Sequence, residues 1–109
     1  MHELGIAQEI VSLVSEHASG RTVTSVTLEI GKLSAILPDA IHFCFDLCSE
    51  GTELEGAELV IHEIPGKAHC PECGADLSFD RPFGRCDCGN CELEWFAGEE
   101  LKVKEFEVT

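Results

Sequence analysis

The chain has 109 residues, 44% of them apolar, and its formal net charge at neutral pH is −14. This length suits one domain with a small added module, and no apolar run approaches the roughly 20 residues that span a bilayer. An acidic surface repels phosphate backbones, so we expect neither a nucleic-acid nor a membrane partner, whereas cations or a basic protein are compatible with it.

The first part of the chain is predicted to form a helix followed by a strand. Over residues 4–19, apolar side chains recur at steps of three and four, which is typical of an amphipathic helix. Over residues 22–30 the apolar positions alternate with polar ones, which indicates a half-buried strand. Gly20 separates the two elements and is suited to the end of a helix.

A second helix and a second strand are predicted next. The helix covers about residues 39–49, after Pro38, and its apolar face contains Cys44 and Cys48, which we interpret as buried, inert core thiols. The strand Leu59–Ile64 is apolar on both faces for most of its length, so we expect it to be central in its sheet.

The closing strand is predicted over Leu101–Val108. Its apolar residues change parity along the strand, and one extra residue near Glu105, a β-bulge, would explain the change. The sequence thus predicts an α+β fold, with a small sheet of about three strands and two helices. Residues 1–65 and 101–109 form the main domain in this interpretation, and 66–100 form an inserted zinc-ribbon or rubredoxin-like module.

The inserted module contains two Cys-x-x-Cys pairs, Cys70/Cys73 and Cys88/Cys91. This spacing is typical of a structural zinc site, because four thiolates complete a tetrahedron and leave no open position. Cys86 could replace Cys88, but we prefer Cys88 with Cys91 because that pair has the spacing of a zinc knuckle. Rubredoxin-type iron also suits such pairs, and His69 is an alternative ligand beside Cys70.

The cysteine content also helps to predict the cellular compartment of the protein. Seven cysteines could form a secreted disulfide framework, but the odd count, the knuckle spacing and the lack of a signal-peptide pattern favour metal thiolates in a reducing cytoplasm. A thioredoxin-like role is disfavoured, because two pairs lie here in a loop-rich region.

The N-terminus is a second candidate metal site. The α-amine, the His2 backbone nitrogen and the His2 imidazole can form fused chelate rings, and Glu3 can add a carboxylate. Such a nitrogen-rich, near-planar set suits Ni(II) or Cu(II). Taken by itself, however, any chain that begins Met-His offers these atoms, and a frayed terminus is the simpler interpretation.

Several segments, taken together, resemble the HypA/HybF family of hydrogenase-maturation nickel metallochaperones. They are Met1-His2-Glu3-Leu4, the run Leu28-Glu29-Ile30-Gly31-Lys32-Leu33-Ser34, Phe43-Cys44-Phe45 with Gly51-Thr52, the two cysteine pairs and the closing strand. The resemblance covers essentially the whole chain in order.

The resemblance implies a carrier protein and not an enzyme. Nickel would bind at Met1, His2 and Glu3, with Asp39 as a further candidate, and a structural zinc at Cys70, Cys73, Cys88 and Cys91, with Cys86 as the alternative. It also implies a HypB-type GTPase and the large subunit of [NiFe]-hydrogenase as partners, and is compatible with a homodimer. No nucleophile–base pair or phosphate loop stands out. The competing interpretations are a rubredoxin-like FeS4 electron-transfer protein and a zinc-ribbon adaptor.

Overall fold

The computed structural model describes residues 3–109, which form a mixed α+β fold. Its elements in chain order are α1 (Glu3–Ala18), β1 (Val23–Gly31), α2 (Pro38–Ser49), β2 (Glu58–Ile64), β3 (Gly66–His69), β4 (Asp76–Phe79), β5 (Glu94–Ala97) and β6 (Leu101–Val108). The chain divides into two compact units: Met1–Glu29, Ile36–His62 and Lys102–Thr109 form the first, Ile30–Ala35 and Glu63–Leu101 the second. None of the helices within residues 3–109 has the length and apolar character of a membrane span.

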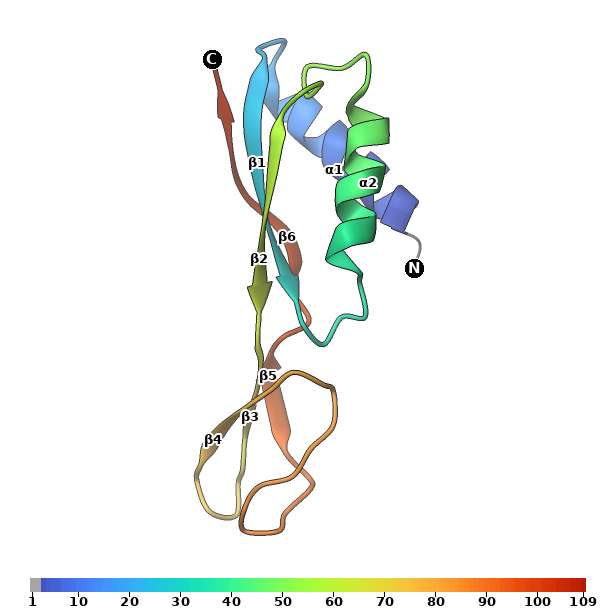
Figure 1. The fold of residues 1–109 in the computed structure, drawn as a ribbon. Helices are drawn as coiled ribbons and strands as arrows, with labels where there is room; N and C mark the ends of the chain where they lie inside the picture. Colours follow the sequence, from blue (N-terminus) through green and yellow to red (C-terminus); the bar gives the residue numbers. More distant parts are fainter. Residues whose placement is uncertain (1–2) are drawn as a thin grey trace. The chain divides into compact units, whose positions relative to one another are not determined.

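The sheet of the first unit has the strand order β2-β1-β6, and both helices cover the same face of it (Figure 1). The closing strand, β6, therefore pairs with β1. The prediction of a central position for residues 59–64 was wrong, because β1 is the central strand. The burial explains the difference: no side chain of β2 is fully buried, whereas Val26, Leu28 and Ile30 of β1 are at most 1% exposed.

The core of the first unit lies between the helices and β1. Helix α1 contributes a continuous buried stripe and α2 contributes Ile41 and Phe45, each at most 1% exposed. The predicted burial of Cys44 and Cys48 was wrong, since both thiols are half-buried. The apolar stripe of α2 is wider than the face of the helix that its neighbours cover. The partial burial of Cys48, together with the nearby Cys44, still raises the pKa of the Cys48 thiol.

Strand β6 changes the face that its apolar side chains occupy. Val103 and Phe106 are half-buried, while Lys104 and Glu105 between them are both exposed. Two successive residues on one face are what a single extra residue produces in a strand. This arrangement supports the predicted bulge near Glu105.

The second unit contains its own three-stranded sheet, in the order β4-β3-β5. Strand β3 pairs antiparallel with both neighbours, and its pairing with β5 shifts register between Lys67 and Ala68. The sequence did not indicate these strands, since four residues are too few for a clear alternation of apolar and polar positions.

The base of the second unit is a point where three chain segments are hydrogen-bonded together. The amides of Gly31, Lys32 and Leu33 donate to the carbonyls of Glu100, Ile64 and Gly98, each at 2.8 Å. A Cβ atom on Gly31 would lie 1.9 Å from the Gly98 carbonyl oxygen, so that close approach requires glycine. We call these three bonded segments the clamp.

The two phenylalanines of α2 provide a matched test of this core. Phe45 is 1% exposed and Phe43 is 66% exposed on the same helix. Because truncation of a buried aromatic ring leaves a cavity, we expect Phe45→Ala to lower the free energy of unfolding by about 3–5 kcal/mol. Phe43→Ala should change it by less than about 1 kcal/mol. Urea unfolding followed by circular dichroism measures both, and equal losses would contradict the assigned core.

Candidate metal centre

Four thiols of the second unit converge on one point. The Sγ atoms of Cys70, Cys73, Cys86 and Cys88 all lie within 4.8 Å of one another. The closest contacts join Cys70 to Cys88 at 3.7 Å and Cys73 to Cys86 at 3.3 Å. No further group of three or more metal-ligating side chains occurs within residues 3–109.

Two backbone turns present these thiols. The Gly74 amide donates to the Cys70 carbonyl at 2.8 Å in the first turn, and the Gly89 amide donates to the Cys86 carbonyl at 2.9 Å in the second. The Cys86 amide also donates to the Asn90 carbonyl, which closes the second turn. Each turn therefore holds two of the four thiols in place by its own backbone.

The cluster differs from the predicted ligand set in one member. Sequence spacing favoured Cys91 as the fourth ligand, but Cys91 is exposed and lies outside the cluster, whereas Cys86 is only 4% exposed and lies inside it. The turn that closes between Cys86 and Asn90 ends before Cys91. The sequence left Cys86 open as a replacement for Cys88, whereas the geometry brings Cys86 into the cluster together with Cys88 and in place of Cys91.

Hydrogen bonding distinguishes the four thiols electrostatically. The Asn90 side-chain amide donates to the Cys70 sulfur at 3.5 Å, and this contact with nearby backbone amides lowers the pKa of Cys70 to about 6. The backbone amide of Cys88 lowers the pKa of Cys86, but the Cys73 thiol and burial more than offset it, so that pKa is raised. A contact between Asn90 and a thiol was not predicted from the sequence. The position of Asn90, two residues after Cys88, could have indicated it.

The donor set fits a structural zinc ion. Zinc binds thiolates at about 2.3 Å, so the sulfurs of a regular tetrahedron lie about 3.8 Å apart. The 3.7 Å between Cys70 and Cys88 matches this value, and the other separations require only small side-chain adjustments. With four thiolates as ligands, a bound zinc would have no open position for a substrate.

His69 does not take part in the cluster. Its Nδ1 lies 2.8 Å from the Asp76 carboxylate in the β3–β4 pair, and this hydrogen bond is the main cause of its raised pKa. The prediction of His69 as an alternative ligand therefore gains no support, since its ring is directed to a carboxylate.

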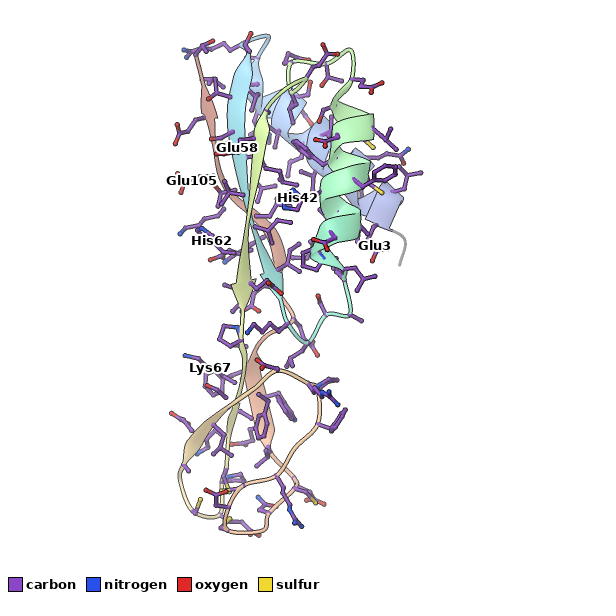
Figure 2. The ribbon with its side chains drawn as sticks, in the orientation of Figure 1. Glu3, His42, Glu58, His62, Lys67 and Glu105 are labelled. Atoms are coloured by element: carbon purple, nitrogen blue, oxygen red, sulfur yellow. The ribbon has the colours of Figure 1, made fainter. Side chains whose placement is uncertain are left out.

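The predicted nickel ligands are only partly described. Met1 and His2 lie outside the described residues. Glu3 begins α1 (Figure 2), and its carboxylate accepts a hydrogen bond of 3.2 Å from the Leu37 amide, directly before α2. Asp39 is exposed in the first turn of α2, two residues after Leu37. The structure thus brings Glu3 to the segment that carries Asp39.

Comparisons with known proteins identify relatives along the whole chain. Residues 1–108 match the family described as HypA, hydrogenase/urease nickel incorporation, metallochaperone. A protein of Nostoc sp. named hydrogenase maturation factor HypA is 61% identical over 108 residues, 99% of this chain and 96% of the relative. The protein of that name from Geobacter metallireducens is 48% identical over 109 residues and covers 99% of both chains.

Solved structures share the fold. The solution structure of the Ni metallochaperone HypA from Helicobacter pylori has a TM-score of 0.69 and 22% identity, over 99% of this chain and 97% of the other. A second solution structure of a HypA protein has a TM-score of 0.73 and 23% identity, with coverages of 100% and 97%.

Substitution of single cysteines separates the two ligand sets. If zinc is held by Cys70, Cys73, Cys86 and Cys88, Cys86→Ser should weaken zinc binding at least about tenfold, because it removes one of four thiolates. Cys91→Ser is the matched control and should retain one zinc per chain. Competition with a chromophoric chelator measures the affinities. The opposite result, loss in Cys91→Ser alone, would restore the set predicted from spacing.

Proposed function

The chain belongs to the HypA family, and from this membership we propose that it binds Ni(II) at its N-terminus and delivers the ion during maturation of [NiFe]-hydrogenase. The observation that carries the proposal is the family match over residues 1–108, which includes the Met1-His2-Glu3 segment. Nickel is the cargo here and not a resident cofactor, so the protein needs no catalytic residue of its own.

The contact of Glu3 supports a site at the start of the first unit. Its carboxylate is held 3.2 Å from the Leu37 amide, so the first turn of α1 is fixed beside the segment that leads into α2. Asp39 of that segment is exposed and can supply a further oxygen ligand. The proposed set therefore combines the Met1 amine and the His2 nitrogens with Glu3, and with Asp39 as an additional candidate.

This set has the chemistry that a carrier requires. Amine and imidazole nitrogens with carboxylate oxygens bind Ni(II) well, yet each nitrogen can regain a proton. We therefore assign nickel exchange to the terminus, and assign to the four-thiol cluster a zinc ion that stabilises the second unit and does not exchange during transfer.

The partners follow from the same family assignment. We propose a HypB-type GTPase as the partner in nickel handling and the hydrogenase large subunit as the receiver. The acidic surface is compatible with cationic cargo or with basic patches on these partners.

A rubredoxin-like electron carrier is the second candidate, because the thiol cluster alone would also suit iron. The family match favours the nickel carrier. An oxidised FeS4 protein is red, whereas a zinc thiolate site is colourless, so the visible spectrum of the purified protein distinguishes the two.

Removal of the His2 imidazole tests the nickel site. We expect His2→Ala to abolish stoichiometric nickel binding in calorimetric titrations, while zinc content and circular dichroism stay unchanged. His62→Ala is the control, since His62 is exposed on β2 (Figure 2). A Gly-Ser extension before Met1 should act like His2→Ala because it removes the α-amine from the chelate. Normal nickel binding in both altered chains would refute the N-terminal site.

The nitrogen ligands also predict a pH dependence. Ni(II) and protons compete for the amine and the imidazole, so the affinity is full when both are deprotonated and is lost as the pH falls. We expect the nickel affinity to fall by about tenfold or more per pH unit below the range in which imidazole gains a proton. Titrations between about pH 8 and pH 5.5 measure this, and a constant affinity would argue for carboxylate ligands alone.

A further inference from the structure

Strand β6 is an outer strand of the sheet in the first unit. It pairs with β1 on one side, and within residues 3–109 no strand pairs with it on the other. Its backbone N–H and C=O groups on that side are therefore available to a further strand.

The sequence of β6 is complementary to itself when a second copy runs antiparallel. With the axis of symmetry between Lys104 and Glu105, each charged residue lies opposite a residue of the other sign and each apolar residue opposite an apolar one. The matched positions are Lys104 with Glu105, Val103 with Phe106, Lys102 with Glu107 and Leu101 with Val108. Opposite charges across an antiparallel pair stabilise it, whereas like charges destabilise it.

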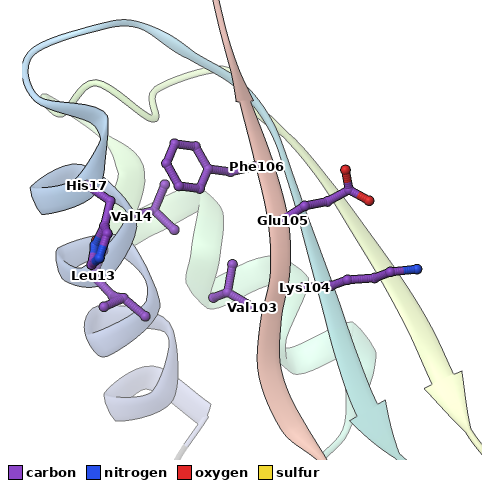
Figure 3. A pocket seen from close by; sticks show the side chains of 7 residues that line it. All are labelled: Leu13, Val14, His17, Val103, Lys104, Glu105 and Phe106. Atoms are coloured by element: carbon purple, nitrogen blue, oxygen red, sulfur yellow. The ribbon is translucent and has the colours of Figure 1, made fainter.

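The face change in β6 makes this register sterically consistent. Directly opposed residues of an antiparallel pair point to the same face of the sheet. In a regular strand, Lys104 and Glu105 would point to opposite faces, and a symmetric pair centred between them could not form. Here both are exposed and point away from α1, while Val103 and Phe106 lie on the α1 side (Figure 3). Moving outward from the axis in either direction, the side chains therefore point to the two faces of the sheet in the same order.

An apolar trough beside β6 extends the surface. It is open, has a volume of about 410 Å³, and is lined by Leu13, Val14 and His17 of α1 and by Val103 to Phe106 of β6. Leu13 is 47% exposed there. A two-fold axis perpendicular to the sheet keeps the helices of both copies on one face, so the α1 helices of both copies would approach each other and cover both troughs.

From these observations we propose that β6 is a homodimerisation edge, at which a second copy of this chain pairs antiparallel and continues the sheet as β2-β1-β6-β6-β1-β2. Six of these cross-strand pairs would carry most of the register: two Val103–Phe106 pairs on the helix face, and two Lys104–Glu105 and two Lys102–Glu107 pairs on the outer face. Lys102 also forms an ion pair of 3.1 Å with Glu29 of its own chain. The central Lys104–Glu105 pairs are therefore the sharper test.

Charge reversal at the centre of the pairing tests the proposal on untagged, zinc-loaded protein without nickel. The interface is small, so we expect the wild-type chain to dimerise with a dissociation constant on the order of 10–100 μM in sedimentation equilibrium. Lys104→Glu and Glu105→Lys should each weaken the homodimer about tenfold or more, because each places like charges opposite one another twice. An equimolar mixture of the two variants should form a heterodimer with wild-type affinity, since both pairs are then complementary.

Glu58→Lys is the control for net charge. It changes the total charge as much as Glu105→Lys does, and Glu58 lies exposed on β2, the opposite edge strand (Figure 2). We expect it to dimerise like the wild type. Circular dichroism checks that every variant is folded. The proposal is overturned if the wild-type chain stays monomeric to about 1 mM. It is also overturned if the mixture fails to form the heterodimer, or if all variants dimerise equally, as a domain-swapped dimer would.

Discussion

The convergence of four thiols is the constraint on which the second unit depends. Apart from cysteines, its buried hydrophobic side chains are only Ile30, Leu33 and Ala68, and its strands of four residues are too short to be stable by themselves. A metal ion bound by several thiolates supplies folding free energy that such a core cannot. The first unit differs, because α1, α2 and β1 bury a continuous core there.

This difference between the units suits two metals with opposite requirements. Two backbone turns and the Asn90 side chain hold the thiols of the cluster in place, which disfavours release of a bound ion. Among the proposed nickel ligands, Glu3 is held beside the start of α2 by a hydrogen bond from the Leu37 amide. In the proposed function, the four-thiol cluster would keep its ion while the N-terminal ligands exchange theirs.

Much of the fold could be predicted from the periodicity of apolar residues. The predictions failed where burial depends on which neighbouring elements cover a side chain. Both helices and the closing strand were predicted to within about two residues, because their apolar patterns are strong. The burial of Cys44 and Cys48 and the central place of residues 59–64 were wrong, since a pattern shows which residues are apolar and not how much surface covers them. The sequence weighed Cys86 only against Cys88, and the presence of both in the cluster depends on a turn closed by the Asn90 carbonyl, which spacing rules do not contain.

The clamp has a consequence for how the thiol cluster assembles. Bonds from Lys32 and Leu33 to Ile64 and Gly98 hold together the two ends of the segment that carries five of the seven cysteines. The entropy lost on closing a loop grows with its length, so tying these ends together shortens the chain that must still be ordered when the thiols meet. Pinning the ends raises the effective concentration of one turn at the other. The clamp thereby contributes to metal affinity without contacting the metal, and loosening it would weaken a site whose ligands are all intact.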